Sequence, residues 1–111
     1  MPQLTVRGVA PDMLIAASEA LVRELADICA CGTDNFTLDW LQTVSAIAGK
    51  RAATYPFVEV AWFERGAQTR DRMAEAITRH LLAVGVQEIE VAFKVYREDG
   101  YYVNGVRCDA L

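Results

Sequence analysis

The stretch YPFVEVAWFERGAQTRDRMAEAITRHLL, residues 55–82, decides the fold of this chain. Phe57 to Phe63 is apolar at nearly every position and rich in β-branched and aromatic residues, which predicts a strand buried on both faces. Gly66 interrupts this run, and apolar residues at helical spacing then predict an amphipathic helix from Thr69, the expected N-cap, to Val84. A second strand is predicted over Glu88–Tyr96, so this part of the chain forms a βαβ unit.

The first half of the chain has the same order of elements. A short strand is predicted over Gln3–Arg7 and a helix over Pro11–Ala30, with the proline at a first helical position. Gly32 is expected to stop this helix in a left-handed conformation. A strand over Phe36–Ile47 completes the unit, and Gly49–Thr54 is the only segment that resembles a linker.

Two tandem βαβ units predict an α+β fold, a two-layer sandwich in one domain that spans residues 1–111. The first unit covers residues 3–47, the second covers 57–96, and a C-terminal hairpin or tail occupies 99–111. Because βαβ crossovers are right-handed, both helices are expected on one face of a four-stranded mixed sheet.

The opposite face of the sheet is predicted to be bare. The buried strand offers apolar side chains to both sides, so we expect another copy of the chain to cover this face. Asn104-Gly105, flanked by tyrosine and valine residues, predicts a terminal hairpin that can pair with a neighbour's sheet edge.

Composition narrows the class of protein. The 111 residues are 53% apolar and 23% charged with a net charge of −4, which is typical of a soluble globular domain and argues against binding nucleic acid. No segment predicts a membrane span or a signal peptide, so we expect a cytoplasmic protein. Three cysteines and the single His80 fit neither a disulfide framework nor a metal site.

A strand that begins directly after Met1-Pro2, two βαβ units of similar size and an aromatic C-terminal tail resemble the tautomerase superfamily. In length the chain is similar to the macrophage migration inhibitory factor type, which carries both units on one chain. The opening MPQLTVRGV and the segment YPFVEVAWFERGAQTRDRMAEAI are most similar to an uncharacterised bacterial branch. The resemblance implies a homotrimer and a cofactor-free keto–enol tautomerase that acts on a 2-oxo acid.

The same resemblance implies a catalytic role for Pro2. In the superfamily, removal of the initiator methionine exposes this proline as a secondary amine, whose pKa falls in apolar surroundings and near cations. Such an amine acts as a general base near neutral pH. If Met1 is retained, Pro2 is an amide nitrogen and is not a base.

Two arginines are the candidates for binding a substrate carboxylate. Arg65 lies between the buried strand and the second helix, and Arg7 ends the first strand; either could hold a carboxylate or stabilise an enolate. The loop 31–35 contains no lysine, although the inhibitory-factor type has one there. This departure favours the alternative function of a non-catalytic trimeric scaffold or binding module that retains the fold.

Glu59 is the one carboxylate within the apolar strand. Because an unpaired buried charge is costly, we expect Glu59 to be buried and paired with an arginine, in a structural rather than catalytic role.

Overall fold

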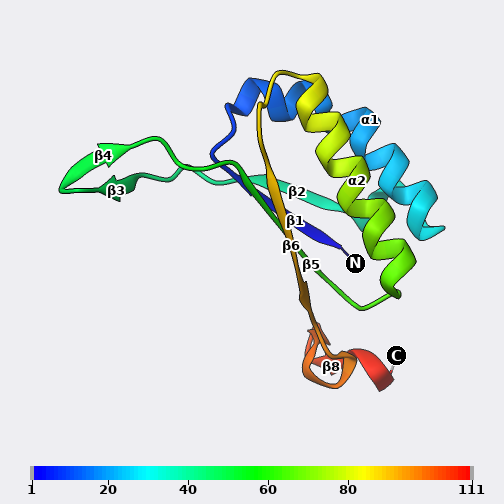
Figure 1. Ribbon diagram of the computed structural model, residues 1–111. Coiled ribbons are helices and arrows are strands. Elements are labelled where there is room, and N and C mark those ends of the chain that lie inside the picture. Colours follow the sequence, from blue (N-terminus) through cyan, green and yellow to red (C-terminus); the bar gives the residue numbers. More distant parts are fainter. Residues whose placement is uncertain (1, 111) are drawn as a thin grey trace.

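A four-stranded sheet with both helices on one face forms the body of the protein in a computed structural model, which describes residues 2–110 (Figure 1). The strand order is β2 (Thr37–Trp40), β1 (Gln3–Arg7), β5 (Phe57–Trp62) and β6 (Glu90–Val95). The pairs β1–β2 and β5–β6 are parallel, whereas the central pair β1–β5 is antiparallel, with Leu4 opposite Val60. The predicted α+β class and mixed sheet are therefore confirmed.

The two helices run side by side over this sheet (Figure 1). Helix α1 spans Pro11–Cys29 and begins with the proline predicted for its first position, and helix α2 spans Ala67–Ala83. Neither helix within residues 2–110 is long and apolar enough to cross a membrane.

The helix ends differ from those predicted. Helix α1 ends with a cap at Ala30, which has φ 54°. The amide of the next residue, Cys31, donates to the Ala26 carbonyl at 3.0 Å. This closure comes two residues before Gly32, so a left-handed alanine replaces the expected glycine stop. Helix α2 begins after Gly66, so Thr69 lies within its first turn and is not the cap.

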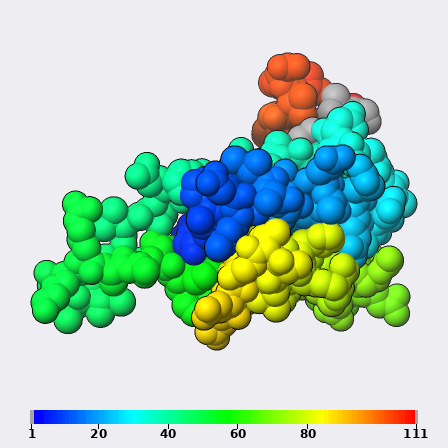
Figure 2. Space-filling model, turned by 90° about the horizontal axis from the view of Figure 1, so that it is seen from above, coloured from blue at the N-terminus to red at the C-terminus, as the bar shows by residue number. Residues whose placement is uncertain are grey.

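A hairpin replaces the predicted linker. Strands β3 (Ser45–Ile47) and β4 (Lys50–Ala52) pair around the turn Ala48-Gly49, whose φ angles of 51° and 74° suit a tight hairpin turn. This β3–β4 arm projects from the body (Figures 1 and 2). The predicted strand Phe36–Ile47 is broken after Trp40 because its partner β1 ends, and the chain pairs again only with itself in the arm.

The predicted C-terminal hairpin is confirmed. Strands β7 (Tyr102–Val103) and β8 (Val106–Arg107) flank a turn in which Asn104 has φ 50° and Gly105 has φ 80°. Three short 3-10 helices, η1 (Thr33–Asn35), η2 (Glu98–Gly100) and η3 (Cys108–Ala110), complete the elements of the described residues. The tail hairpin lies at the end of the sheet opposite to the arm (Figure 1).

The hydrophobic core fills the space between the sheet and the helices. Alternate residues of the two central strands point toward the helices, as period-2 geometry requires. The side chains that are buried almost completely there are Leu4, Val6, Val58, Val60, Trp62, Leu21, Leu25, Met73, Ile77 and Leu81. Burial of this set orients the sheet and leaves the other residues of each strand on the helix-free face.

The helix-free face is more polar than predicted. Strand alternation places Thr5 on this face, and its neighbours across the sheet are Glu59 and then Ala92. Glu59 is exposed in the single chain and takes part in no ion pair within residues 2–110. The expectation that Glu59 is buried and paired is therefore wrong for the single chain, because its flanking partners are a threonine and an alanine rather than a cation.

A charged cluster joins the two helices on their outer surface. The guanidinium of Arg79 on α2 donates to both oxygens of Glu24 on α1, and His80 Nε2 lies 2.9 Å from Glu24 Oε1. Hydrogen bonding by Arg79, and secondly by His80, lowers the pKa of Glu24 to about 2. The cluster therefore favours the ionised carboxylate in the folded state.

This cluster predicts a loss of stability in acid. Because the folded-state pKa of Glu24 is lowered, its stabilisation is fully present above the ordinary value of 4.5 and is lost as pH falls from 4.5 toward 2. Melting temperatures of wild type and Glu24→Gln, measured across that range, should converge as pH falls. Parallel curves for the two proteins would contradict this assignment, and Glu19→Gln, which removes an exposed pair with Arg23 on one helix, serves as the control.

Candidate functional site

Pro2 directly precedes β1, and β1 begins at the end of the sheet where α2 begins (Figure 1). Its side chain is buried almost completely, and its carbonyl accepts the Thr37 amide at 3.2 Å. The register that pairs Gln3 with Ala61 places Pro2 beside Trp62 of β5. The candidate base is thus enclosed between two neighbouring strands. Met1, on whose removal the predicted role of Pro2 depends, lies outside the described residues.

Arg65 lies at the same end of the sheet as Pro2. Its guanidinium carbon is 5.5 Å from the centre of the Trp62 ring, and one N–H group donates to the Phe63 carbonyl at 3.2 Å. These two contacts hold the guanidinium over an aromatic face, a favourable cation–π arrangement. The other N–H groups of the guanidinium make no hydrogen bond among residues 2–110 and can donate to an anion.

Trp62 itself was predicted only as part of a buried strand. It is completely buried, and its ring centre lies 5.0 Å from that of Phe93. The indole Nε1–H has no hydrogen-bond partner among the described residues, which is uncommon for a buried donor. Its place in the site follows from the strand register and from no signal in the sequence.

The C-terminal segment closes the helix-free side of this corner. Gln3 Nε2 donates to the Tyr101 hydroxyl at 3.0 Å, and the Tyr101 ring lies 5.0 Å from Phe63 and 5.4 Å from Tyr96. The aromatic tail noted in the sequence therefore packs beside the Pro2 end of the sheet.

Cys29 borders the same corner from helix α1. Its Sγ lies 3.5 Å from the Met73 sulfur, and burial raises the pKa of the Cys29 thiol, although the charge of Arg65 opposes that shift. The thiol is therefore protonated near neutral pH, and it is not an activated nucleophile.

Arg7 lies at the far end of β1, where it pairs with Phe57. It lies five positions along the chain from Pro2, roughly 16 Å at about 3.3 Å per residue. The structure therefore brings Pro2 and Arg65 to one end of the sheet and leaves Arg7 at the other end of the same chain.

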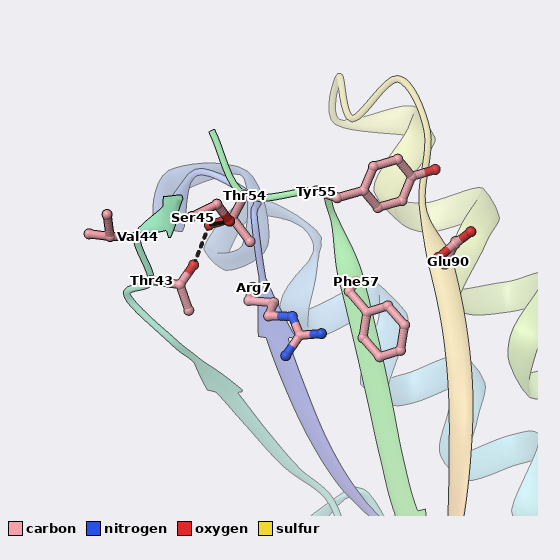
Figure 3. A pocket seen from close by; sticks show the side chains of 8 residues that line it. All are labelled: Arg7, Thr43, Val44, Ser45, Thr54, Tyr55, Phe57 and Glu90. Carbon is pink, nitrogen blue, oxygen red and sulfur yellow. Dashed lines mark hydrogen bonds between the residues drawn. The ribbon is translucent and has the colours of Figure 1, made fainter. Parts of the chain in front are cut away.

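Arg7 lines a cavity of about 520 Å³ at the base of the β3–β4 arm (Figure 3). Its guanidinium lies over the Phe57 ring, 4.7 Å from the ring centre. The remaining lining residues come from both sides of the arm and from the two neighbouring strands: Thr43, Val44, Ser45, Thr54, Tyr55 and Glu90. We call this space the Arg7 cavity.

The sequence matches one protein family, and the fold matches several solved structures. A family model described as "Domain of unknown function (DUF1904)" matches residues 1–107. A crystal structure of a DUF1904 domain from Sebaldella termitidis is 30% identical, covers 96% of this chain and 98% of its own, and superposes with a TM-score of 0.87. A protein of unknown function from Vibrio cholerae is 29% identical over 96% of this chain and 86% of its own, with a TM-score of 0.83.

More distant structures share the fold alone. A fused 4-OT, described as a wild-type asymmetric trimer, is 13% identical over 97% of both chains with a TM-score of 0.80. A search among curated proteins gave no significant match. The resemblance inferred from the opening residues and the βαβ repeat is thereby confirmed at the level of fold and of bacterial branch.

Proposed function

This chain belongs to the DUF1904 family, a branch with the tautomerase fold, and from that premise we propose that it is a tautomerase-like protein acting on a 2-oxo acid. The proposed base is Pro2, and no cofactor takes part. The observation that carries the proposal is the burial of Pro2 directly before β1, in the corner that also holds Arg65.

The chemistry requires a free secondary amine at Pro2. Burial of Pro2 disfavours an ammonium form and therefore favours a neutral amine once Met1 is removed. The Pro2 nitrogen takes a proton from C3 of the keto acid, and the electron pair of the broken C–H bond forms the C2–C3 double bond while the carbonyl becomes an enolate oxygen. The Pro2 ammonium then gives the same proton to the enolate oxygen, which yields the enol and restores the neutral amine. The reverse sequence returns the keto acid, so atoms and charge balance.

Arg65 is the proposed clamp for the substrate carboxylate or the developing enolate. Its contacts with Trp62 and Phe63 restrict the guanidinium, which reduces the entropy lost when an anion binds. Arg7 is proposed as a second substrate-binding residue only if a neighbouring chain brings it to the Pro2 end.

We expect Pro2→Ala to reduce enol–keto tautomerisation of phenylpyruvate by about 10²–10⁴-fold, the usual contribution of a general base. The rate is followed by enol absorbance, on protein whose intact mass shows that Met1 is absent. Arg65→Lys should raise KM more than it lowers kcat, because an ammonium keeps the charge without the planar fork. Equal rates for wild type and Pro2→Ala would contradict Pro2 as the base.

A non-catalytic scaffold or binding module is the second candidate. Pro2 is buried almost completely in the single chain, so a substrate does not reach it without movement of the surrounding side chains. The absence of a lysine in the loop 31–35 agrees with this alternative. Retention of Met1 in protein isolated from the native host would favour the scaffold, since the amide nitrogen of Pro2 then has no base function.

In either case we propose a homotrimer, and a cytoplasmic location stays a prediction. Three structures of fused 4-OT with this fold are described as trimers. Large apolar side chains on the projecting arm and tail also support self-association, with Val44 65%, Ile47 64% and Tyr102 59% exposed. Light scattering should give three times the mass of one chain. A monomer at micromolar concentration would contradict the trimer, and a dimer would contradict its symmetry.

A further inference from the structure

We propose that the Arg7 cavity is a second ligand site, which binds a small carboxylate that also carries an amino group. Within one chain the site lies at the opposite end of the sheet from the Pro2 corner, and it does not depend on the proposed tautomerase activity. Its volume of about 520 Å³ falls within the usual range for small-molecule pockets.

One side of the cavity is a preformed anion site. The guanidinium of Arg7 is held against the Phe57 ring at 4.7 Å, which restricts its plane and leaves its edge free. Arg7 makes no salt bridge or side-chain hydrogen bond within residues 2–110. A guanidinium edge with free N–H donors matches a carboxylate in a bidentate geometry.

Three hydroxyl groups at the base of the arm add a further donor. Thr43 Oγ1 lies 2.6 Å from Thr54 Oγ1, and Ser45 Oγ donates to the same Thr54 oxygen at 3.2 Å (Figure 3). Three hydroxyl protons therefore serve two hydrogen bonds, whichever threonine donates to the other. One O–H donor of this triad is left over, and it can bond to an acceptor in the cavity.

The opposite side of the cavity is acidic. The register pairs Arg7 with Phe57 and Phe57 with Glu90, so two opposite charges flank one aromatic ring across three adjacent strands. Their Cα atoms are two strand spacings apart, about 10 Å. The two side chains form no ion pair with each other in the chain, so each is available to a ligand.

Tyr55 lines the cavity beside Glu90 and also lies near Glu88. Desolvation, followed by a hydrogen bond to Glu88 and the charges of Glu88 and Glu90, raises the pKa of its phenol. A simple carboxylate would be attracted by Arg7 but repelled from this side. An ω-amino carboxylate places its negative end at Arg7 and its ammonium group at Glu90, and therefore satisfies both sides.

Three matched pairs of probes test this proposal: β-alanine and propionate, γ-aminobutyrate and butyrate, and 5-aminopentanoate and pentanoate. Each is titrated into the full chain and followed by amide chemical shifts in NMR. In wild type, at least one amino acid should bind about threefold or more tightly than its partner, with shifts at the arm base. Glu90→Gln should remove this preference, and Arg7→Gln should weaken all binding about tenfold or more.

The outcome separates this site from the proposed active site. Pro2→Ala should leave these affinities unchanged, whereas loss of binding in that variant would show that the probes bind in the Pro2 corner and would overturn the proposal. Equal binding of each matched pair would overturn the role of Glu90. No shifts at millimolar concentrations would also overturn the proposal, and would indicate that a neighbouring chain fills the cavity.

Discussion

Replacing Gly8 by alanine is expected to lower the free energy of unfolding by about 2–5 kcal/mol. Gly8 follows β1 directly and has φ 76°, a left-handed conformation that disfavours a side chain. A Cβ atom there would lie 2.5 Å from the Tyr55 carbonyl oxygen and 2.6 Å from the Thr54 carbonyl oxygen. Both contacts are with backbone that leads into β5, so no side chain can move aside to relieve them. Urea unfolding monitored by circular dichroism measures the effect.

Gly49→Ala is the matched control for this substitution. Gly49 has nearly the same φ, 74°, but a Cβ added there meets no atom within 4 Å. Gly49→Ala should therefore lower the free energy of unfolding only by the cost of a left-handed alanine, about 1–2 kcal/mol. Equal losses for the two variants would show that the close approach at Gly8 relaxes, and that only backbone conformation matters.

Trp62→Ala is expected to cost about 3–5 kcal/mol, because it removes the largest completely buried side chain and leaves a cavity. The indole fills the corner between the sheet and α2, and it packs against Phe93 and supports Arg65. The same unfolding measurement tests this, and the Arg65 clamp should weaken in parallel, seen as a higher KM for a carboxylate substrate if the tautomerase proposal holds.

Trp62→Phe removes less side-chain volume than Trp62→Ala and also removes the indole N–H group. Phenylalanine keeps an aromatic ring opposite Phe93 but removes the Nε1–H group that has no partner among the described residues. Since no hydrogen bond among the described residues is lost and only part of the side-chain volume is removed, the cost should be clearly smaller than that of Trp62→Ala. A loss as large as that of the alanine variant would mean that the N–H group is hydrogen-bonded in solution.

Strong periodicity made the central elements predictable. The apolar run of β5 and the helical spacing of α2 each persist over several residues, so the βαβ unit and the sheet were foreseen. The arm was not predicted, because Ala48 occupies the first turn position. An asparagine there would have given the Asn-Gly pair that is typical of a hairpin turn. Similarly, Ala30 takes the left-handed position at which a glycine was expected.

The candidate site was only partly predictable, because side-chain neighbours depend on register. Pro2 and Arg65 share an end of the sheet because β1 and β5 are antiparallel, and the same pairing sends Arg7 to the far end. Glu59 was expected to be buried since its strand is apolar, yet strand alternation places it on the helix-free face. The position of Arg7 depends on strand pairing, which composition and spacing do not give, whereas that of Glu59 follows from alternation once the face covered by the helices is known.

Because each half of the chain contains one parallel strand pair, the chain resembles a dimer of two similar halves. Each half supplies its own parallel pair and its own helix, while β1 with β5 and α1 with α2 hold the halves together. The only covalent link between them passes through the projecting arm. A cut at Ala48-Gly49 would therefore leave every strand pair of the main sheet intact, and the two fragments should reassemble when expressed from separate genes. A circularly permuted chain whose new termini lie in the arm should therefore also fold. The two halves can also accumulate different substitutions, as two separate genes would.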